Sequence, residues 1–85
     1  MTEFERAQAL IARWRESQTG VRFADLAKVC RLYFGEPRRK GSHLVYRTPW
    51  RETPIVNIQS HDGEAKPYQV RQVLRAIDLK EKSDG

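Results

Sequence analysis

The chain has 85 residues, of which 39% are hydrophobic and 32% are charged, and its formal net charge of +5 corresponds to a pI near 9.8. This length and composition predict one small globular domain and exclude a disordered chain, and no apolar run approaches the length of a membrane span. The excess of basic over acidic residues favours an anionic partner, such as nucleic acid, an acidic protein or an anionic surface.

The chain is predicted to begin with a helix over residues 2–17. Thr2 and Glu5 have the spacing of a capping box, and the segment lacks the basic and apolar regions of a signal peptide. Apolar residues recur on one side of this helix: Phe4, Ala7, Leu10, Ile11 and Trp14. Such a stripe usually faces a core, so we interpret residues 1–20 as an N-terminal helix that packs on the core. Docking to a partner or to a second copy is the alternative.

A second helix is predicted from about residue 22 to Phe34, with Gly35 ending it. Its apolar stripe has helical spacing and consists of Phe23, Leu26, Ala27, Cys30, Tyr33 and Phe34. Cys30 lies on that stripe, so we expect it to be a small buried side chain rather than a nucleophile. It is the only cysteine, which rules out an intramolecular disulfide and suggests the reducing cytoplasm.

The most informative stretch follows, where three cations lead through Gly41 and Ser42 to His43. Residues 35–51 contain five bases and one acid, and this positive peak lies inside the predicted fold. Cations attract phosphate, a Gly-Ser step allows close approach to the main chain, and histidine exchanges a proton near neutral pH. We therefore predict that the phosphate contacts are Arg38, Arg39, Lys40, Gly41 and Ser42. The alternatives are a solvated basic edge and a structural histidine.

Three strands are predicted in the middle of the chain. Pro37 limits residues 36–40 to a short edge strand, residues 42–48 form the clearest strand, and residues 55–59 form the next. Residues 48–54 read as a hairpin loop bounded by prolines. In the clearest strand, His43, Val45 and Arg47 share one face and Leu44 and Tyr46 the other, but both faces are mixed, so the pattern does not decide which is buried. In the next strand, Val56 and Ile58 are expected to face the core.

A last helix is predicted to open at Lys66 and Pro67 and to end near Leu79, with residues 80–85 forming a flexible tail. Its apolar face consists of Val70, Val73, Leu74 and Ile77. Arg71 and Arg75 lie on the outward face, where contact with RNA and plain solvation are equally good interpretations. The predicted class is α+β, with an extra helix before an α-β-β-β-α unit whose two helices cover one face of an antiparallel sheet.

The titratable residues suggest hydrolytic chemistry on RNA without a cofactor. His43, His61 and Cys30 do not fall at metal-ligand spacings, so we expect no metal or other cofactor. An imidazole among cations suits cleavage in which the ribose 2′-hydroxyl attacks the adjacent phosphate while His43 moves the proton. DNA lacks that hydroxyl, so the mechanism predicts selectivity for RNA.

Three stretches of the chain resemble the HicA family of toxins, which are small ribonucleases of type II toxin–antitoxin systems. They are residues 40–46, with the Gly-Ser-His step, residues 56–59, and residues 64–74, with the Lys-Pro-Tyr-Gln-Val-Arg-Gln run. The resemblance covers roughly residues 21–79, and it implies a fold like that of double-stranded-RNA-binding domains. The family's catalytic histidine falls on His43, and the second histidine that many members carry beside it is Leu44 here.

The resemblance implies a toxin that cleaves mRNA and a HicB-like antitoxin that binds it and covers its active site. In this fold Lys66 would stand where a phosphate backbone is commonly contacted. The domains are then residues 1–20 as the N-terminal helix, 21–79 as the HicA-like domain and 80–85 as the tail. Two alternatives remain: a module of the same fold that binds RNA without cutting it, and a basic partner that docks an acidic protein.

Overall fold

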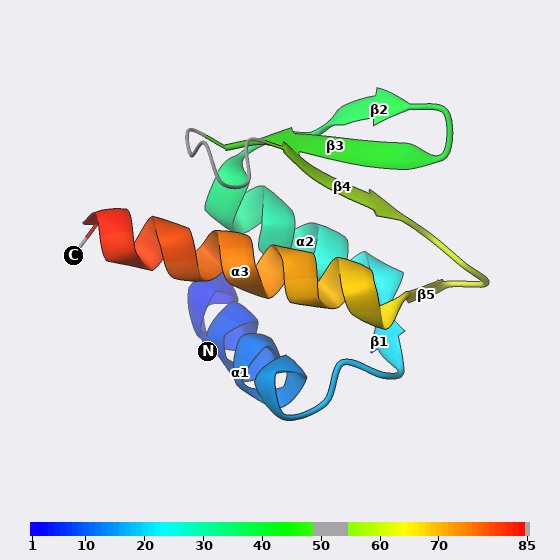
Figure 1. Cartoon of the computed structure of the whole chain (residues 1–85). Coiled ribbons are helices and arrows are strands. Elements are labelled where there is room, and N and C mark those ends of the chain that lie inside the picture. Colours follow the sequence, from blue (N-terminus) through cyan, green and yellow to red (C-terminus); the bar gives the residue numbers. More distant parts are fainter. Residues whose placement is uncertain (49–54, 85) are drawn as a thin grey trace.

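The computed structural model describes residues 1–48 and 55–84. Its three helices are α1 (Glu3–Glu16), α2 (Phe23–Phe34) and α3 (Pro67–Asp84). Its strands are β1 (Val21–Arg22), β2 (Arg38–Lys40), β3 (His43–Arg47), β4 (Ile55–Gln59) and β5 (Glu64–Ala65). The order after α1 is therefore helix, strands and helix, and the predicted α+β class is confirmed (Figure 1).

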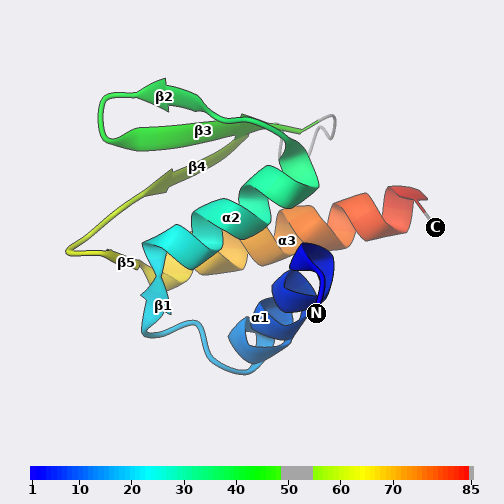
Figure 2. The same ribbon diagram turned by 180° about the vertical axis from the view of Figure 1, so that it is seen from behind.

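The molecule is built in three layers. Strands β2, β3 and β4 form an antiparallel sheet, α2 packs against β3, and α3 packs against β4. Helix α1 contacts both α2 and α3 on the side away from the sheet, as the two opposite views show (Figures 1 and 2). One face of the sheet is thus covered by α2 and α3, and no described element covers the other face, which we call the open face.

The buried face of β3 is the one that carries Leu44 and Tyr46. Tyr46 is only 1% exposed, and its hydroxyl group donates to the Ala27 carbonyl of α2 at 3.3 Å. Val56 and Ile58 of β4 point the same way and are fully buried, as predicted. Because alternate side chains of a strand point to opposite faces, the remaining residues of β3 must lie on the open face.

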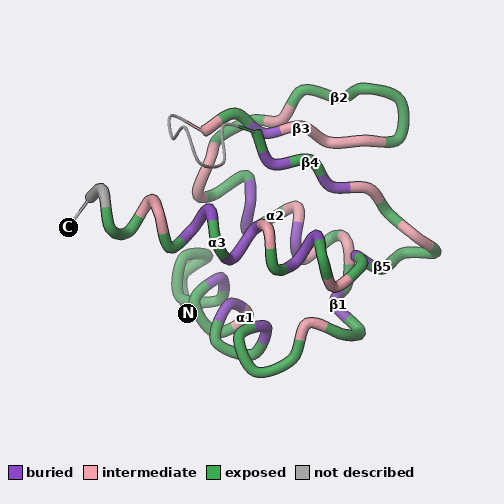
Figure 3. Tube along the Cα trace, in the orientation of Figure 1, coloured by how far each residue is buried: buried purple, intermediate pink, exposed green. Residues whose placement is uncertain are grey.

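The hydrophobic core lies between the layers, along the inner sides of all three helices (Figure 3). The predicted stripe of α3 is buried, and so is Cys30 of α2, where burial raises the pKa of the thiol above its ordinary value. The core residues contributed by α2 and α3 are Leu26, Val29, Cys30, Val70, Val73, Leu74, Ala76 and Ile77. Cys30 therefore behaves as a packed apolar group and not as a nucleophile.

Helix α1 begins with the predicted capping box. The Thr2 hydroxyl accepts from the Glu5 amide at 3.1 Å, the Glu5 carboxylate accepts from the Thr2 amide at 2.9 Å, and these hydrogen bonds lower the pKa of Glu5. The inner side of the helix joins the core through Ala7, Ile11 and Trp14. Phe4 departs from the predicted stripe, since it is 48% exposed and contacts the Tyr33 ring of α2 at a centroid distance of 5.9 Å.

A short strand pair was not predicted from the sequence. Val21 and Arg22 pair antiparallel with Ala65 and Glu64, so that β1 and β5 tie the start of α2 to the start of α3. The turn before β5 has positive φ at Asp62 (53°) and Gly63 (83°), as the two central residues of a type I′ turn require. A two-residue strand is too short to show periodicity, so only the tertiary structure reveals this pairing.

Two further expectations concern segment ends. Helix α3 continues to Asp84, which corrects the predicted end near Leu79, while the flexibility predicted for residues 80–85 stays a prediction. Beyond Thr48, the predicted hairpin loop of residues 48–54 lies outside the described residues.

Within the described ranges, no helix combines the length and the apolar character needed to cross a bilayer.

The burial of Trp14 predicts how much α1 contributes to stability. Trp14→Ala should lower the free energy of unfolding by about 3–5 kcal/mol, because it removes a large side chain that is 5% exposed between α1 and the other helices. Urea denaturation followed by circular dichroism measures the change. Gln8→Ala, on the exposed side of the same helix, is the matched control and should stay within about 0.5 kcal/mol of the wild type. Equal effects of the two substitutions would contradict this packing of α1.

Candidate functional site

The predicted site begins with a tight hairpin between β2 and β3. Lys40 pairs with His43, so Gly41 and Ser42 are the two central residues of the turn. Gly41 has φ of +62°, a conformation that glycine adopts without strain at the first central position of a type II′ turn. The turn therefore explains the Gly-Ser step structurally, and it places Lys40 and His43 directly opposite each other.

His43 is half-buried at the start of β3 and is held by a neighbouring strand. Its Nδ1 lies 2.9 Å from Oδ1 of Asn57, which sits diagonally across on β4. A carbonyl oxygen can only accept, so the ring nitrogen that faces it must carry the proton. In the neutral ring, Nε2 is then the nitrogen that can take up a further proton, which is the arrangement a general base needs.

The cations of the hairpin divide between the two faces of the sheet. Arg38 pairs with Val45 and Lys40 pairs with His43, which puts both cations on the open face. Arg47 of β3 lies on the same face, opposite Ile55. Arg39 pairs with Leu44, so it is directed to the other side of the sheet, although it is exposed at the edge. The structure thus gathers Arg38, Lys40, Arg47 and His43 on the open face, whereas Arg39 points to the other side of the sheet.

A broad hollow of about 780 Å³ lies beside these cations. Its lining residues from the open face are Arg38, Lys40, Val45, Arg47, Ile55 and Asn57, and Phe34, Glu36, Pro37 and Arg39 complete it. His43 adjoins the hollow through Lys40 and Asn57 and is not part of its lining. Glu36 forms an exposed ion pair with Arg31 at 2.7 Å, so this acidic side chain is directed to a cation of α2.

The remaining predicted contacts lie elsewhere. Ser42 is exposed in the turn, and its hydroxyl accepts from the Gln59 side-chain amide at 2.8 Å. Lys66 is exposed just before α3, and Arg71 and Arg75 are exposed on α3 itself, in the helical layer rather than on the open face. His61 begins the turn before β5 and bridges to Glu64, beyond the end of β4.

Sequence reasoning missed two residues that belong to the site. Arg47 was placed on the His43 face by alternation but was not named as a phosphate contact. Asn57 lies between the buried Val56 and Ile58 and therefore points outward, but its contact with His43 across the sheet has no signal in the sequence. Alternation along β3 could have identified Arg47, whereas the contact with Asn57 depends on the register between β3 and β4.

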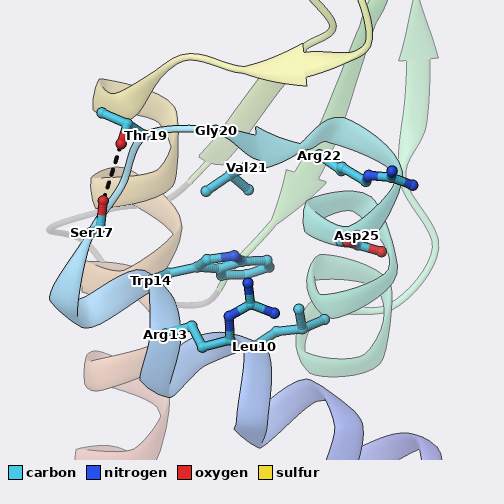
Figure 4. Close-up of a pocket in the computed structure, with 9 residues that line it drawn as sticks. All are labelled: Leu10, Arg13, Trp14, Ser17, Thr19, Gly20, Val21, Arg22 and Asp25. Carbon is cyan, nitrogen blue, oxygen red and sulfur yellow. Dashed lines mark hydrogen bonds between the residues drawn. The ribbon is translucent and has the colours of Figure 1, made fainter.

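A second hollow, of about 370 Å³, lies on the helical side of the molecule between α1 and the start of α2 (Figure 4). Arg13 reaches alongside the indole of Trp14 there, and the Ser17 and Thr19 hydroxyls are hydrogen-bonded at 3.1 Å across the loop that follows α1. Arg22 and Asp25 bring opposite charges to its other wall. This hollow belongs to the junction of helices and not to the open face.

In the described part of the chain, no group of three or more His, Cys, Asp or Glu side chains is placed to hold a metal ion. Comparison with protein-family models, with curated proteins and with solved structures found no match. Function must therefore be inferred from the geometry of the open face.

The contact with Asn57 predicts the tautomer of His43. Long-range ¹H–¹⁵N correlation spectra of the neutral ring should show the proton on Nδ1, and Asn57→Leu should remove this preference because a leucine side chain cannot accept a hydrogen bond. Ile55→Leu, a conservative change on the same strand and face, is the control. His61→Gln assigns the two histidine signals. A wild-type His43 with its proton on Nε2 would show that the contact is absent.

Proposed function

We propose that this protein is an endoribonuclease that cleaves RNA without a metal ion and that His43 transfers the proton. The observation that carries the proposal is the placement of His43 on the open face, with Nδ1 bonded to Asn57 and Lys40 directly opposite. An oriented imidazole beside a cation supplies a base and a counter-charge for a phosphate. A surface that only bound phosphate would need the cations but not the imidazole.

The reaction follows from the chemistry of these groups. Nε2 of His43 accepts the proton of a ribose 2′-hydroxyl, whose oxygen attacks the adjacent phosphorus atom. The bond from phosphorus to the 5′-oxygen breaks, and that oxygen takes a proton from solvent, leaving a 2′,3′-cyclic phosphate and a 5′-hydroxyl end. Lys40 and the neighbouring arginines stabilise the negative charge that grows on the phosphate oxygens. DNA has no 2′-hydroxyl and is bound without being cut.

The open face also suggests how the RNA lies. Arg38 and Lys40 are two residues apart on β2, which spaces their Cα atoms by about 7 Å, and Arg47 extends the row across β3. None of the open-face strand residues is acidic; they are Arg38, Lys40, His43, Val45, Arg47, Ile55, Asn57 and Gln59. A strand of RNA that crosses this face would meet Lys40 directly opposite His43, and Arg38 and Arg47 farther from the turn. Contacts from Lys66, Arg71 and Arg75 would need RNA that also reaches the helical layer.

The family-level proposal goes further. We propose a HicA-like toxin of the cytoplasm, with mRNA as its substrate and a HicB-like antitoxin as its partner. Its support is the residue resemblance together with the order α2-β2-β3-β4-α3, in which both helices lie on one face of the sheet, as in a double-stranded-RNA-binding domain. Helix α1 is added on the far side of α2 and α3, so it leaves the open face accessible to a partner.

One observation favours a second candidate, a module that binds RNA without cleaving it. The described residues of the open face provide one imidazole, and Leu44 points away from it into the helical side. A second group that protonates the leaving oxygen is therefore not supplied by a neighbouring histidine. Binding without cleavage needs only the cations, which both candidates share.

Substitution of His43 decides between the two candidates. His43→Ala should lower the cleavage rate of a labelled RNA about 10²- to 10⁴-fold, the usual cost of losing an acid–base group, while RNA binding changes little. His61→Ala is the matched control and should cleave like the wild type, since His61 lies in the turn before β5. Circular dichroism confirms that both variants are folded.

Three results would contradict the proposed ribonuclease activity. Cleavage by folded His43→Ala at the wild-type rate would make His43 a structural residue. Binding by the wild type without cleavage would establish the non-cleaving module. An absence of RNA affinity altogether would favour the basic surface as a docking site for an acidic protein.

Alternate residues of β2 test which face meets the RNA. Lys40→Ala should reduce the slope of log affinity against log salt by roughly 0.7, the value for one phosphate contact on single-stranded nucleic acid. Arg39→Ala removes the same charge from the opposite side of the sheet and should leave the slope nearly unchanged. Filter binding over a salt series measures both. Equal reductions by the two variants would show that the RNA wraps the edge of the sheet instead of lying on the open face.

A further inference from the structure

Gln69 is a polar residue in an unusual place. It lies in the first turn of α3 and is only 3% exposed, and within the described part of the chain it is the one buried side chain that carries an amide or a charge. A buried amide is costly unless its donor and acceptor are both satisfied. The partners of Gln69 therefore indicate why a glutamine is placed where α3 meets the sheet.

The partners of Gln69 are the backbone groups of Gln59, the last residue of β4. We assign the side-chain amide of Gln69 with its nitrogen toward the Gln59 carbonyl, because the opposite orientation sets acceptor against acceptor and donor against donor. In this orientation the nitrogen donates to the Gln59 carbonyl at 3.1 Å, and the side-chain oxygen accepts from the Gln59 backbone amide at 3.2 Å. Strand β4 is at the edge of the sheet, so this pair of bonds replaces those that another strand would provide. The backbone of Gln69 is held in turn, because its backbone amide donates to the Lys66 carbonyl at 2.9 Å.

The same residue of β4 borders the His43 site. Gln59 pairs with His43 in the sheet, and its side-chain amide donates to the Ser42 hydroxyl at 2.8 Å. The backbone groups of Gln59 are directed to Gln69 and not to β3. Gln59 and His43 therefore form a non-hydrogen-bonded pair, in which opposing side chains are closest together. Gln69 thus holds the end of β4 that sets the positions of His43 and, two residues earlier, Asn57.

We propose that Gln69 is a positioning residue for the His43 site. By fixing the end of β4 against α3, it keeps Asn57 at hydrogen-bond distance from Nδ1 and Gln59 at hydrogen-bond distance from Ser42. The effect of Gln69 on the positions of Asn57 and Gln59 is argued from these contacts alone, whereas its effect on cleavage rests on the proposed function. Gln69 touches neither RNA nor the reacting atoms in this assignment.

Gln69→Met is the test variant, because methionine nearly keeps the length and volume of glutamine but loses both hydrogen bonds. Hydrogen exchange of the Gln59 amide should become about tenfold faster, and the ¹H–¹⁵N spectrum of His43 should lose the preference for a proton on Nδ1. In the cleavage assay, kcat should fall about ten- to hundredfold while KM stays close to the wild-type value, since the cations that bind phosphate are untouched. Gln72→Met, a half-buried glutamine one turn along α3, is the matched control and should change none of these quantities.

Two results would overturn the proposal. An unchanged exchange rate at Gln59 would show that the contact does not hold the strand, and faster exchange with an unchanged His43 spectrum would make Gln69 a core residue without influence on the site. If Gln69→Met does not fold, Gln69→Asn replaces it, because the shorter side chain keeps the amide but does not reach the backbone groups of Gln59. If the wild type does not cleave RNA, the proposed function fails, but the exchange rate and the His43 spectrum still decide whether Gln69 positions the site.

Discussion

The structure depends on the burial of one face of β3 and β4 against α2 and α3. Leu44 packs against the core, and Tyr46, Val56 and Ile58 are within it, where Tyr46 also bonds the backbone of α2. Since side chains alternate along a strand, this burial leaves no choice for the others: His43 and Arg47 must face outward, and a slip of one residue would reverse both sets. The candidate site is therefore a direct consequence of how the core is packed.

The open face concentrates positive charge without burying it. Arg38, Lys40 and Arg47 are exposed, so water screens their mutual repulsion and their cost to stability is small. The same repulsion is relieved when an anion binds, which makes the face better suited to a polyanion than to another basic surface. His43 differs from these cations because it is half-buried and hydrogen-bonded to Asn57, and its orientation is fixed before any ligand arrives.

The layer farthest from the sheet contributes to stability rather than to the candidate site. Helix α1 adds Ala7, Ile11 and Trp14 to the core and is joined to α3 by the pair Arg15–Asp78 at 2.7 Å, where the hydrogen bond to Asp78 raises the pKa of Arg15. A chain of this size has little core to spare, so a further packed helix is a substantial stabilising contribution. Its position on the far side of α2 and α3 strengthens the domain without covering the open face.

The local elements of the chain could be predicted from its amino-acid pattern alone. The capping box at Thr2, the stripes of α2 and α3, the strand at 55–59 and the buried Cys30 all follow from short-range spacing, and all are present. Four features became apparent from the tertiary structure: which face of β3 is buried, the opposite directions of Arg39 and Lys40, the pairing of β1 with β5, and the contacts of Asn57 with His43 and of Gln69 with Gln59. The physical reason is that each of these contacts joins segments distant in the chain, and their register is set by packing of the whole core rather than by the pattern of any one segment.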